Sequence, residues 1–227
     1  MPSPDLHATL QRLCDRLAAH FGALHWWPAQ SPFEVVVGVI LTQNTAWRNV
    51  EYAIANLQEA DALTPAALAG LDPSALEALI RPAGFFRQKA ERLQLFARHL
   101  FARHGGELAA LLAGPLETVR AELLACKGVG PETADSILLY AGGHPSFVVD
   151  AYTRRLFTRL GLLRGDEGYE ATRALFMDHL PPDTDLFNEY HALIVEECKT
   201  FCRKRSPLCP ACPLLAVCPY GQAATAA

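Results

Sequence analysis

Four of the seven cysteines crowd into one short stretch near the C-terminal end of the chain. Six, two and five residues separate them, and they are Cys202, Cys209, Cys212 and Cys218. A disulfide framework is not expected in a reducing compartment, so the cluster predicts metal ligation by thiolates. Structural zinc usually takes two close cysteine pairs, whereas this stretch has one. The spacing leaves both zinc and an iron–sulfur cluster open.

A tight glycine turn lies in the middle of the chain. Residues 123–141 read LLACKGVGPETADSILLYA, which predicts two helices joined by Gly128, Val129 and Gly130. Such a turn leaves N–H groups free at a helix start, where the helix dipole favours an anion. Two of its three residues have no side chain, so a phosphate can come close. The turn therefore predicts a contact with a DNA backbone, and a plain helix–helix turn with glycine caps is the alternative.

A carboxylate stands at the start of another predicted helix. Asp150 follows the apolar run Phe147–Val149 and precedes a helix expected over residues 151–160. Aspartate is a favoured N-cap, and capping alone would account for its position. A carboxylate held still in this way can also stabilise a positively charged sugar or orient a water molecule. Asp150 is therefore a candidate catalytic residue.

The elements that position these residues are predicted to be helices. Residues 31–34 form a capping box with proline at the first helical position, and Thr64-Pro65 and Asp72-Pro73 repeat this start signal. Apolar residues follow each start at spacings of three and four. The only β-like run, residues 147–149, is hardly long enough for a strand. We predict an all-α fold of about ten helices.

Composition and charge restrict the class of protein. Hydrophobic residues make up 51% and charged residues 19%, which excludes long disorder. The apolar run Val35–Leu41 is too short to span a bilayer. The net charge of −4 excludes a strongly basic chain, although DNA binding depends on local charge rather than on the sum. Residues 1–5 show no basic region followed by an apolar one, so we expect no secretory signal and a cytoplasmic location.

The glycine turn, followed by Thr133-Ala134-Asp135, resembles the helix-hairpin-helix of the endonuclease III family of DNA glycosylases. In the family, the essential aspartate follows a valine at a similar distance past the hairpin. The resemblance therefore implies that Asp150, which follows Val149, is that aspartate. The spacing of the four cysteines is that of the [4Fe–4S] loop in endonuclease III and adenine glycosylase relatives. The resemblance therefore implies a [4Fe–4S] cluster as cofactor. Lys199, Arg203 and Lys204 surround the start of this loop and would contact a DNA phosphate.

The hairpin departs from the pattern of those members that also cleave the DNA strand. They carry a lysine in a run like GVGRKTA, and its amine attacks the sugar C1′ to form a Schiff base. Glu132 occupies the lysine position here, and a carboxylate cannot form an imine. Lys127 lies before the hairpin and is a poor substitute. We predict a monofunctional enzyme that uses water, with Glu132 and Asp150 facing a DNA cleft. An acid in the first turn of a helix is also favourable by itself.

Three further runs resemble the 3-methyladenine DNA glycosylase branch of the same family. They are Trp26-Trp27-Pro28, the LTQNT run of residues 41–45, and the RPAGFFRQKA run of residues 81–90. The resemblance implies that Trp26, Trp27 and Trp47 wall a pocket for a flipped base. A methylated purine is cationic, and an electron-rich ring holds it by stacking and cation–π attraction. Filling of the core is the alternative for these rings.

The same runs contain residues that the resemblance places against the DNA duplex. Gln43 stands where the family inserts a glutamine into the gap left by the flipped base. Phe85 stands near the second insertion position, where an apolar side chain wedges the opposite strand. Arg87 and Lys89 are candidate phosphate contacts, although an ordinary solvated helix face fits them equally well.

These patterns together predict a repair enzyme that binds double-stranded DNA containing damaged bases as a monomer, with no membrane association. A helical barrel with the hairpin is expected over residues 31–142. Residues 1–30 and 143–227 would form an iron–sulfur cluster domain. The predicted reaction is hydrolysis of the N-glycosidic bond of an alkylated purine. The alternatives are a glycosylase for oxidised pyrimidines with weak lyase activity, and a DNA-binding relative whose catalytic pocket has decayed. In a prokaryote the protein would lie at the nucleoid.

Overall fold

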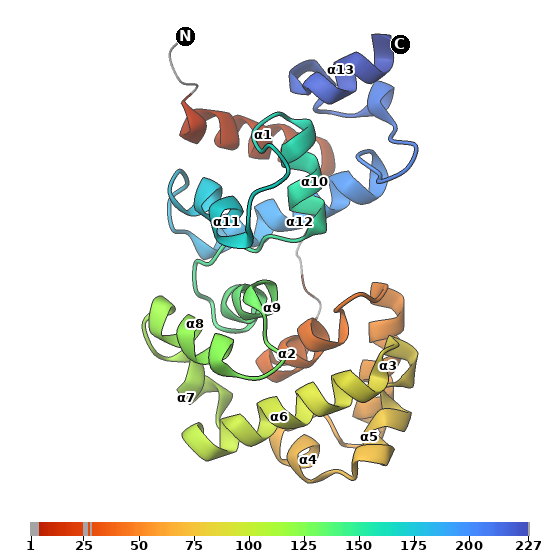
Figure 1. Cartoon of the computed structure of the whole chain (residues 1–227), viewed down its shortest axis with the longest axis vertical. Coiled ribbons are helices and arrows are strands. Elements are labelled where there is room, and N and C mark those ends of the chain that lie inside the picture. Colours follow the sequence, from red (N-terminus) through yellow and green to blue (C-terminus); the bar gives the residue numbers. More distant parts are fainter. Residues whose placement is uncertain (1–4, 25–26, 28, 227) are drawn as a thin grey trace. The chain divides into compact units, whose positions relative to one another are not determined.

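The computed structural model describes residues 5–24, 27 and 29–226 of the chain (Figure 1). Helices joined by turns and loops make up the described part, which contains no β-strand. The prediction of an all-α fold is therefore confirmed. Residues 147–149 form an extended segment without a partner strand among the described residues, as their short length suggested. No helix in the described part is both long enough and apolar enough to cross a lipid bilayer.

The chain folds as two compact units, each built from helices. The hairpin unit comprises Trp27–His144, and the terminal unit combines Met1–Trp26 with Pro145–Ala227. The hairpin unit contains α2 (Pro32–Leu41), α3 (Trp47–Glu59), α4 (Pro65–Gly70), α5 (Pro73–Leu79), the 3-10 turn η1 (Arg81–Ala83), α6 (Phe86–His104), α7 (Leu108–Leu112), α8 (Leu116–Ala125), α9 (Pro131–Ser136) and the π-helical turn η2 (Ile137–Ala141). The terminal unit contains α1 (Leu6–Phe21), α10 (Ala151–Arg159), α11 (Tyr169–Met177), α12 (Thr184–Thr200), the 3-10 turns η3 (Cys209–Ala211) and η4 (Leu215–Val217), and α13 (Pro219–Ala226).

The core of the hairpin unit forms around α2, which is buried along almost its whole length. Residues 33–41 are all buried, which explains why this helix has a nearly continuous apolar sequence instead of one apolar stripe. The Ser31 hydroxyl accepts the backbone N–H of Glu34 at 3.1 Å and caps the helix. The Glu34 carboxylate accepts the N–H of Gln30 at 3.2 Å, one residue before the N-cap, so the predicted capping box closes in a shifted form.

A buried ion pair joins the two helices on either side of the glycine turn. Arg120 of α8 donates to both carboxylate oxygens of Asp135 in α9, from Nε at 2.8 Å and from Nη2 at 3.1 Å. Asp135 is fully buried and Arg120 nearly so. A bidentate salt bridge of this kind fixes both the separation and the relative orientation of the two side chains, because the planar guanidinium meets the planar carboxylate. It therefore holds α8 and α9 at one orientation across the turn.

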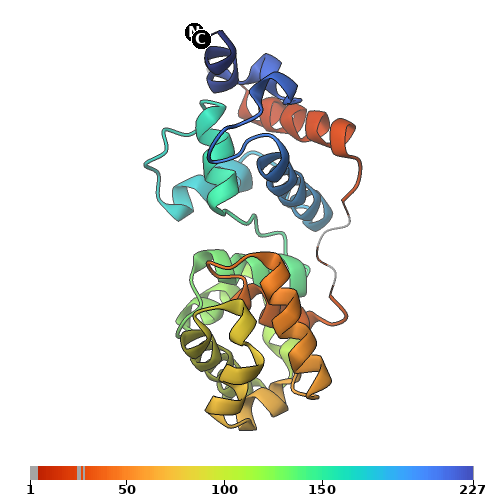
Figure 2. The same ribbon diagram turned by 90° about the vertical axis from the view of Figure 1, so that its right-hand side faces the viewer.

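The terminal unit packs sequence-distant helices against one another. Helix α1 packs on α12, and Figure 2 shows the red α1 beside the longer of the blue helices, α12. The buried Tyr190 hydroxyl of α12 donates to the Leu10 carbonyl of α1 at 3.0 Å. Phe147 stacks on Phe176 at a centroid separation of 3.8 Å. The extended segment before α10 is thereby anchored in an aromatic core, which places Asp150 at the start of that helix.

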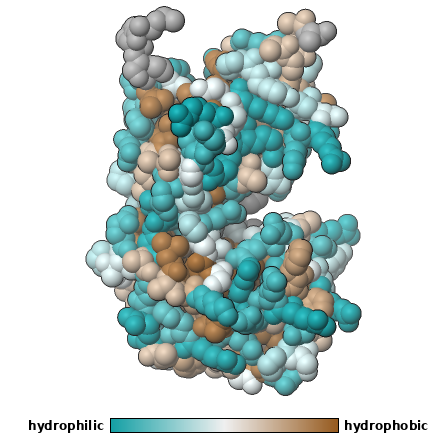
Figure 3. All heavy atoms as spheres, in the orientation of Figure 1, coloured by the Kyte–Doolittle hydropathy of each residue, from teal (hydrophilic) through white to brown (hydrophobic). Residues whose placement is uncertain are grey.

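The surfaces of both units are mainly hydrophilic on the face drawn in Figure 3, with apolar residues in small groups. Six large apolar side chains are exposed among the described residues: Tyr52, Phe85, Phe101, Leu208, Val217 and Tyr220. Scattered apolar side chains are normal on a protein surface, so exposure alone assigns none of them a function.

Candidate functional site

The glycine turn between α8 and α9 has the backbone geometry that its sequence predicted. Gly128 has φ +94°, a conformation that L-residues with a side chain rarely adopt. A Cβ atom on Gly128 would also lie 2.5 Å from Cγ of Arg92 in α6. The Val129 N–H donates to the Cys126 carbonyl at 3.0 Å, and Gly130 is the N-cap of α9. Gly128 is therefore needed both for the turn and for the close approach of α6.

Gln43 is tied directly to this hairpin. It lies in the turn between α2 and α3, and its amide nitrogen donates to the Thr133 hydroxyl of α9 at 2.9 Å. Its amide oxygen accepts from the guanidinium of Arg92, the residue that packs against Gly128. The structure thus brings together two sites that lie far apart in the sequence, the proposed insertion residue and the proposed phosphate-binding turn.

Phe85 is an exposed aromatic side chain at the tip of another turn. It is 66% exposed and directly precedes α6. Its φ of +46° lies in the left-handed region, which is uncommon for a residue with a bulky side chain. Backbone strain of this kind persists only where the surrounding structure imposes it, and it is concentrated at functional sites. The strained conformation and the exposure together make Phe85 a candidate functional residue, which exposure alone would not.

Arg87 and Lys89 lie in α6 but in opposite environments. Arg87 is exposed and lies 3.8 Å from the Glu77 carboxylate. Lys89 is only 1% exposed, and its ammonium donates to three acceptors inside the unit. The expectation that Lys89 contacts a DNA phosphate is therefore wrong for this structure. A pattern of charges along a helix could not show that this lysine faces inward, because its acceptors come from two distant turns.

The predicted aromatic pocket is represented by Trp27 and Trp47, since Trp26 lies outside the described residues. The two rings meet edge to face at 5.1 Å between centroids. A third ring, Tyr140, lies 5.0 Å from Trp27 with an angle of 31° between the planes. All three rings are partly exposed, so they retain ring surface for another group. Gly38 allows the approach of Trp27 to α2, because a Cβ there would lie 3.2 Å from the indole.

Tyr140 is a member of this aromatic cluster that the sequence reasoning missed. It lies in the π-helical turn η2, at the end of the helix that follows the hairpin. A π-turn rotates the residues after it relative to an ideal α-helix, and such turns are frequent at functional sites. The only sequence signal for Tyr140 was its aromatic side chain at the end of the hairpin helix. An aromatic residue at such a position is equally typical of a protein core.

Asp150 caps α10 and is held by two neighbouring residues in the terminal unit. One carboxylate oxygen accepts the backbone N–H of Thr153 at 2.7 Å and its hydroxyl at 2.9 Å. The other lies 3.7 Å from the ring nitrogen Nε2 of His191 in α12. Burial raises the pKa of this carboxyl, but the interactions with His191 and Thr153 outweigh it, and the pKa is lowered overall. Asp150 is thus both a cap and an ionised carboxylate; His191 was not anticipated from the sequence.

Glu132 lies in the first turn of α9 and is exposed. Its backbone carbonyl accepts the Ser136 hydroxyl at 2.7 Å, so the short helix is stabilised locally. The neighbouring Lys127 is exposed, and its ammonium pairs with the Glu91 carboxylate at 2.8 Å. The amines of the hairpin unit are therefore Lys127, directed to α6, and the buried Lys89.

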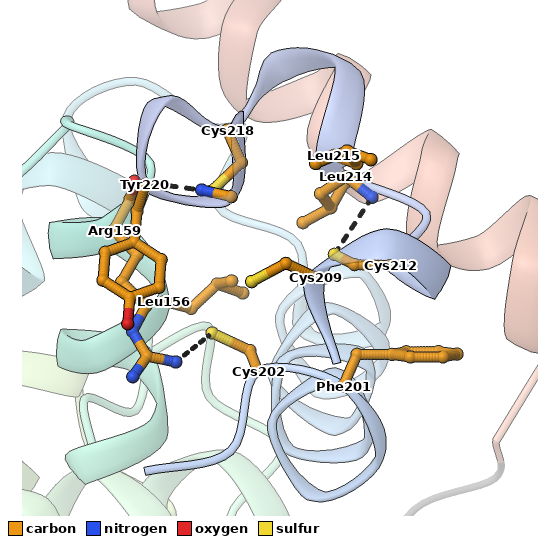
Figure 4. Close-up of a pocket in the computed structure, with 11 residues that line it drawn as sticks. Leu156, Arg159, Phe201, Cys202, Cys209, Cys212, Leu214, Leu215, Cys218 and Tyr220 are labelled. Atoms are coloured by element: carbon orange, nitrogen blue, oxygen red, sulfur yellow. Dashed lines mark hydrogen bonds between the residues drawn. The ribbon is translucent and has the colours of Figure 1, made fainter. Parts of the chain in front are cut away.

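The cysteine loop surrounds one pocket. Cys202, Cys209, Cys212 and Cys218 all line it (Figure 4). No disulfide forms among the seven cysteines of the chain, all of which are described. No group of three or more His, Cys, Asp or Glu side chains in the described residues is arranged to hold a single metal ion. The four thiols thus line one cavity.

Three of the four loop sulfurs accept N–H donors. Arg159 of α10 donates to the sulfur of Cys202 at 3.2 Å, and the backbone N–H of Leu214 and of Gly221 point to Cys212 and Cys218 at 3.4 and 3.3 Å. Figure 4 shows the contacts of Cys202 with Arg159 and of Cys212 with Leu214 as dashed lines. Donors aimed at sulfur favour the thiolate over the thiol, but burial outweighs them at Cys212 and Cys218, whose pKa values are raised. The hydrogen bond with Cys198 and the charge of Arg159 lower the pKa of Cys202, although burial opposes them.

Basic residues lie on two sides of the loop. Arg159 and Arg155 of α10 reach inward, where Arg159 stacks over Tyr220 at 4.5 Å and Arg155 donates to the Cys202 carbonyl at 2.8 Å. The predicted DNA contacts Lys199, Arg203 and Lys204 are exposed side chains. The two arginines of α10 were not singled out from the sequence. Their spacing of four residues was the available signal, and it is also ordinary for any helix.

The fold and these residues define a class of helix-hairpin-helix DNA repair proteins. Residues 37–182 match the HhH-GPD superfamily of base excision DNA repair proteins. A protein of Methanocaldococcus jannaschii, named as a candidate DNA repair glycosylase, is 48% identical over 204 residues, which cover 89% of this chain and 92% of the relative. The chain therefore belongs to the HhH-GPD superfamily, and within it to the endonuclease III-like DNA repair glycosylases.

Two solved structures extend this relationship. A trapped covalent intermediate of endonuclease III with DNA superposes with a TM-score of 0.84 at 27% identity, covering 96% of this chain and 98% of that one. The H. pylori 3-methyladenine DNA glycosylase bound to 1,N6-ethenoadenine superposes with a TM-score of 0.71 at 28% identity, covering 86% and 97% of the two chains. The resemblance inferred from the hairpin and the cysteine loop is confirmed at the level of the family.

The two hairpin glycines provide a matched test of the turn. Gly128→Ala should lower the free energy of unfolding by about 1–3 kcal/mol, because alanine is strained at a positive φ and its Cβ would meet Arg92. Gly130→Ala should cost less than about 1 kcal/mol, since Gly130 has an ordinary φ and its added Cβ meets no atom within 4 Å. Urea denaturation of both variants measures the difference, and equal losses would contradict this account of Gly128.

Proposed function

We propose that this glycosylase removes alkylated purines from double-stranded DNA by hydrolysis, without cleaving the strand. The observation that carries the substrate class is the cluster of partly exposed rings formed by Trp27, Trp47 and Tyr140. A purine alkylated on a ring nitrogen carries a positive charge, and aromatic ring faces attract it by stacking and cation–π interaction. The partial exposure of all three rings supports contact with a base that has left the DNA stack.

The proposed reaction needs little acid catalysis, because an alkylated purine leaves as a neutral base. The bond from C1′ to the purine nitrogen breaks with its electron pair on the base, and positive charge develops on the sugar. Water adds its oxygen to C1′ and releases a proton to solvent. Asp150 stabilises the sugar charge and orients the water, for which it must be ionised. The contacts from Thr153 and His191, which lower its pKa, support this role.

The absence of strand cleavage follows from the amines near the hairpin. Glu132 stands at the position where bifunctional relatives have a lysine, and its carboxylate cannot attack C1′ to form an imine. Lys89 is buried with its ammonium bonded to three acceptors. Lys127 lies on the other side of the turn and pairs with Glu91.

We assign Glu132 to the catalytic region as a second carboxylate beside the DNA.

The proposed DNA contacts are of two kinds, contacts with the phosphate backbone and side chains that insert into the duplex. The turn of Gly128, Val129 and Gly130 would present a phosphate with the backbone at the start of α9, where Gly130 is the N-cap, while the Val129 N–H stays bonded to Cys126. Gln43 and Phe85 are the side chains proposed to enter the duplex, and the exposure of Phe85 supports the wedge. The exposed basic side chains would add phosphate contacts, and these are Arg87, Lys199, Arg203 and Lys204. The protein is proposed to act as a monomer.

We also propose that the four loop cysteines hold a [4Fe–4S] cluster. All four cysteines line one pocket, and three of their sulfurs accept N–H donors, which suits the sulfur ligands of a cluster. The spacing of the four cysteines, which resembles that of the [4Fe–4S] loop in endonuclease III relatives, favours the cluster over zinc. When bound, the cluster would tie the loop from Cys202 to Cys218 together and could carry an electron; base release needs no step through it.

An endonuclease III-type activity on oxidised pyrimidines is the second candidate. The endonuclease III complex superposes more closely than the 3-methyladenine glycosylase, with TM-scores of 0.84 and 0.71. The replacement of the lysine by Glu132 opposes the lyase part of that activity. A DNA-binding relative with a decayed site is the third, and the ionised, well-held Asp150 opposes it.

Release assays on defined DNA distinguish these functions. We expect release of 3-methyladenine from methylated DNA and of 1,N6-ethenoadenine from a duplex, but none from a duplex containing thymine glycol. Strand breaks should appear only after alkaline treatment, and borohydride should trap no covalent protein–DNA adduct, because no amine attacks C1′. Release of thymine glycol together with an efficient adduct would favour the second candidate and contradict the first.

Asp150→Asn separates catalysis from capping, because asparagine is an equally good N-cap. The single-turnover rate of base release should fall by roughly 10²–10³-fold, equivalent to about 3–4 kcal/mol of transition-state stabilisation. Binding to lesion DNA should persist, since a negative charge near phosphates is removed. Asp72→Asn is the matched control, because Asp72 is also an N-cap aspartate that accepts two backbone N–H groups. Unchanged release by a folded Asp150→Asn variant would leave Asp150 as a cap only.

The cofactor can be tested without measuring activity. Protein purified without oxygen should be brown, with broad visible absorption and close to four iron atoms per chain, as expected for a [4Fe–4S] cluster. Cys202→Ser should lose most of the iron and the colour, whereas Cys126→Ala, which changes a buried cysteine of the hairpin unit, should keep both. One zinc and no iron in the wild-type protein would contradict the proposal.

A further inference from the structure

Lys89 is a deeply buried charged group of the hairpin unit, at 1% exposure. Its ammonium donates to the Leu41 carbonyl, the Thr45 hydroxyl and the Ala83 carbonyl, each at 2.8 Å. An ammonium has three N–H donors, so these bonds use all of them. Burial, with a smaller contribution from the charge of Arg92, lowers the pKa of Lys89 to about 8.

The three acceptors belong to two separate turns. The first turn, residues 42–46, joins α2 to α3 and contains Gln43; Leu41 is the last residue of α2. The second turn, residues 80–85, joins α5 to α6 and ends at Phe85. The Thr45 hydroxyl also donates to the Ala83 carbonyl, so the two turns are bonded to each other as well as to Lys89. One buried ammonium therefore sets the separation of the turns that carry Gln43 and Phe85.

Both turns contain a residue in the left-handed region that is not glycine. Asn44 has φ +54° and Phe85 has φ +46°. Each conformation costs free energy by itself and persists only where the surroundings impose it. The contacts of Lys89 fall close to them, at Thr45, which follows Asn44, and at Ala83, two residues before Phe85. A buried charge is a poor source of stability, because loss of hydration offsets much of what its bonds contribute. Its consequence here is geometric, because it defines the paths of both turns.

We propose that Lys89 is a positioning residue that holds the Gln43 and Phe85 turns at one spacing, so that both side chains enter the DNA duplex together. This inference rests on the proposed function, since it assigns the two side chains to duplex insertion. Lys89 itself touches no DNA. Its effect is confined to the step in which the gap is filled, and it leaves the chemistry at C1′ unchanged.

Two sets of variants test the ammonium. Lys89→Met keeps the length of the side chain but removes the three donors. Thr45→Val removes one acceptor and the bond to Ala83, whereas Thr45→Ser keeps the hydroxyl and is its matched control. Arg98→Met removes a positive charge from an exposed position of the same helix and controls for net charge. If Lys89→Met does not fold, the Thr45 pair decides the question.

The first measurement needs no lesion that the enzyme must recognise. A duplex with a tetrahydrofuran abasic analogue opposite 2-aminopurine reports by fluorescence whether side chains enter the gap. Wild type, Thr45→Ser and Arg98→Met should bind and change the fluorescence. Lys89→Met and Thr45→Val should bind with a fluorescence change reduced several-fold, because the two side chains no longer reach the gap together. This readout stays informative even if the proposed lesion class fails.

The second measurement compares base release from two forms of one lesion. In single-stranded DNA, 1,N6-ethenoadenine is already unpaired and leaves no gap to fill. Lys89→Met and Thr45→Val should release it at the wild-type rate from single strands but roughly tenfold more slowly from a duplex. Equal losses on both substrates, or a normal fluorescence change in folded Lys89→Met and Thr45→Val proteins, would overturn the proposal. If wild type releases no ethenoadenine from either form, the proposed substrate fails and the fluorescence result alone judges Lys89.

Discussion

The close approach of Arg92 to Gly128 is the contact on which the geometry of the hairpin unit depends. Only a residue without a Cβ atom leaves room for the arginine side chain and also adopts the φ of +94° that the turn requires. Arg92 can then reach Gln43, which in turn bonds to Thr133 at the start of the hairpin helix. Arg92 thereby connects the backbone of the turn with the Gln43 side chain of a distant loop. A substitution of Gly128 would displace Arg92 and so change the position of both.

Charged groups in this protein are held by specific partners inside each unit. The Arg120–Asp135 pair defines the angle between the helices of the hairpin, and Lys89 defines the separation of two turns. In the terminal unit, Asp150 is held by Thr153 and His191. Buried charges contribute little net stability, but removing one partner is costly, so they restrict the structure to one arrangement. A glycosylase needs this restriction, because an extruded base has to meet groups at defined positions.

The cysteine loop shows the same dependence on partners from other elements. The thiols of residues 202–218 come from a segment with little regular structure, and Arg159 of α10 supplies both a donor to Cys202 and a bond to the Arg203 carbonyl at 2.9 Å. Glu197 of α12 is buried and accepts the thiol of Cys212 at 3.0 Å, and burial raises the pKa of this carboxyl to about 7. The environment of the pocket is thus built by two helices as much as by the loop itself.

Local patterns in the sequence were sufficient for the helices, for the glycine turn and for the family. Capping residues followed by proline and by apolar spacing predict helices because the interactions involved lie within a few residues of one another. The hairpin needs a positive φ at one position, and a glycine there predicts it, because glycine adopts this conformation without a steric penalty. For the same reason Asp150 could be placed at an N-cap, where the structure has it. The cysteine spacing likewise predicts a ligand set without any knowledge of its surroundings.

Only the tertiary structure decided which side chains meet. The inward direction of Lys89 depends on carbonyls 6 and 48 residues away, so its charge pattern suggested a surface contact instead. Tyr140 joins Trp27 through a π-turn, and His191 reaches Asp150 from a helix 41 residues further along the chain. These contacts are set by how helices pack, and side-chain packing depends on the summed shape of many residues rather than on any local signal. The sequence by itself therefore determined the elements and the chemistry available, while the fold decided the partners of each group.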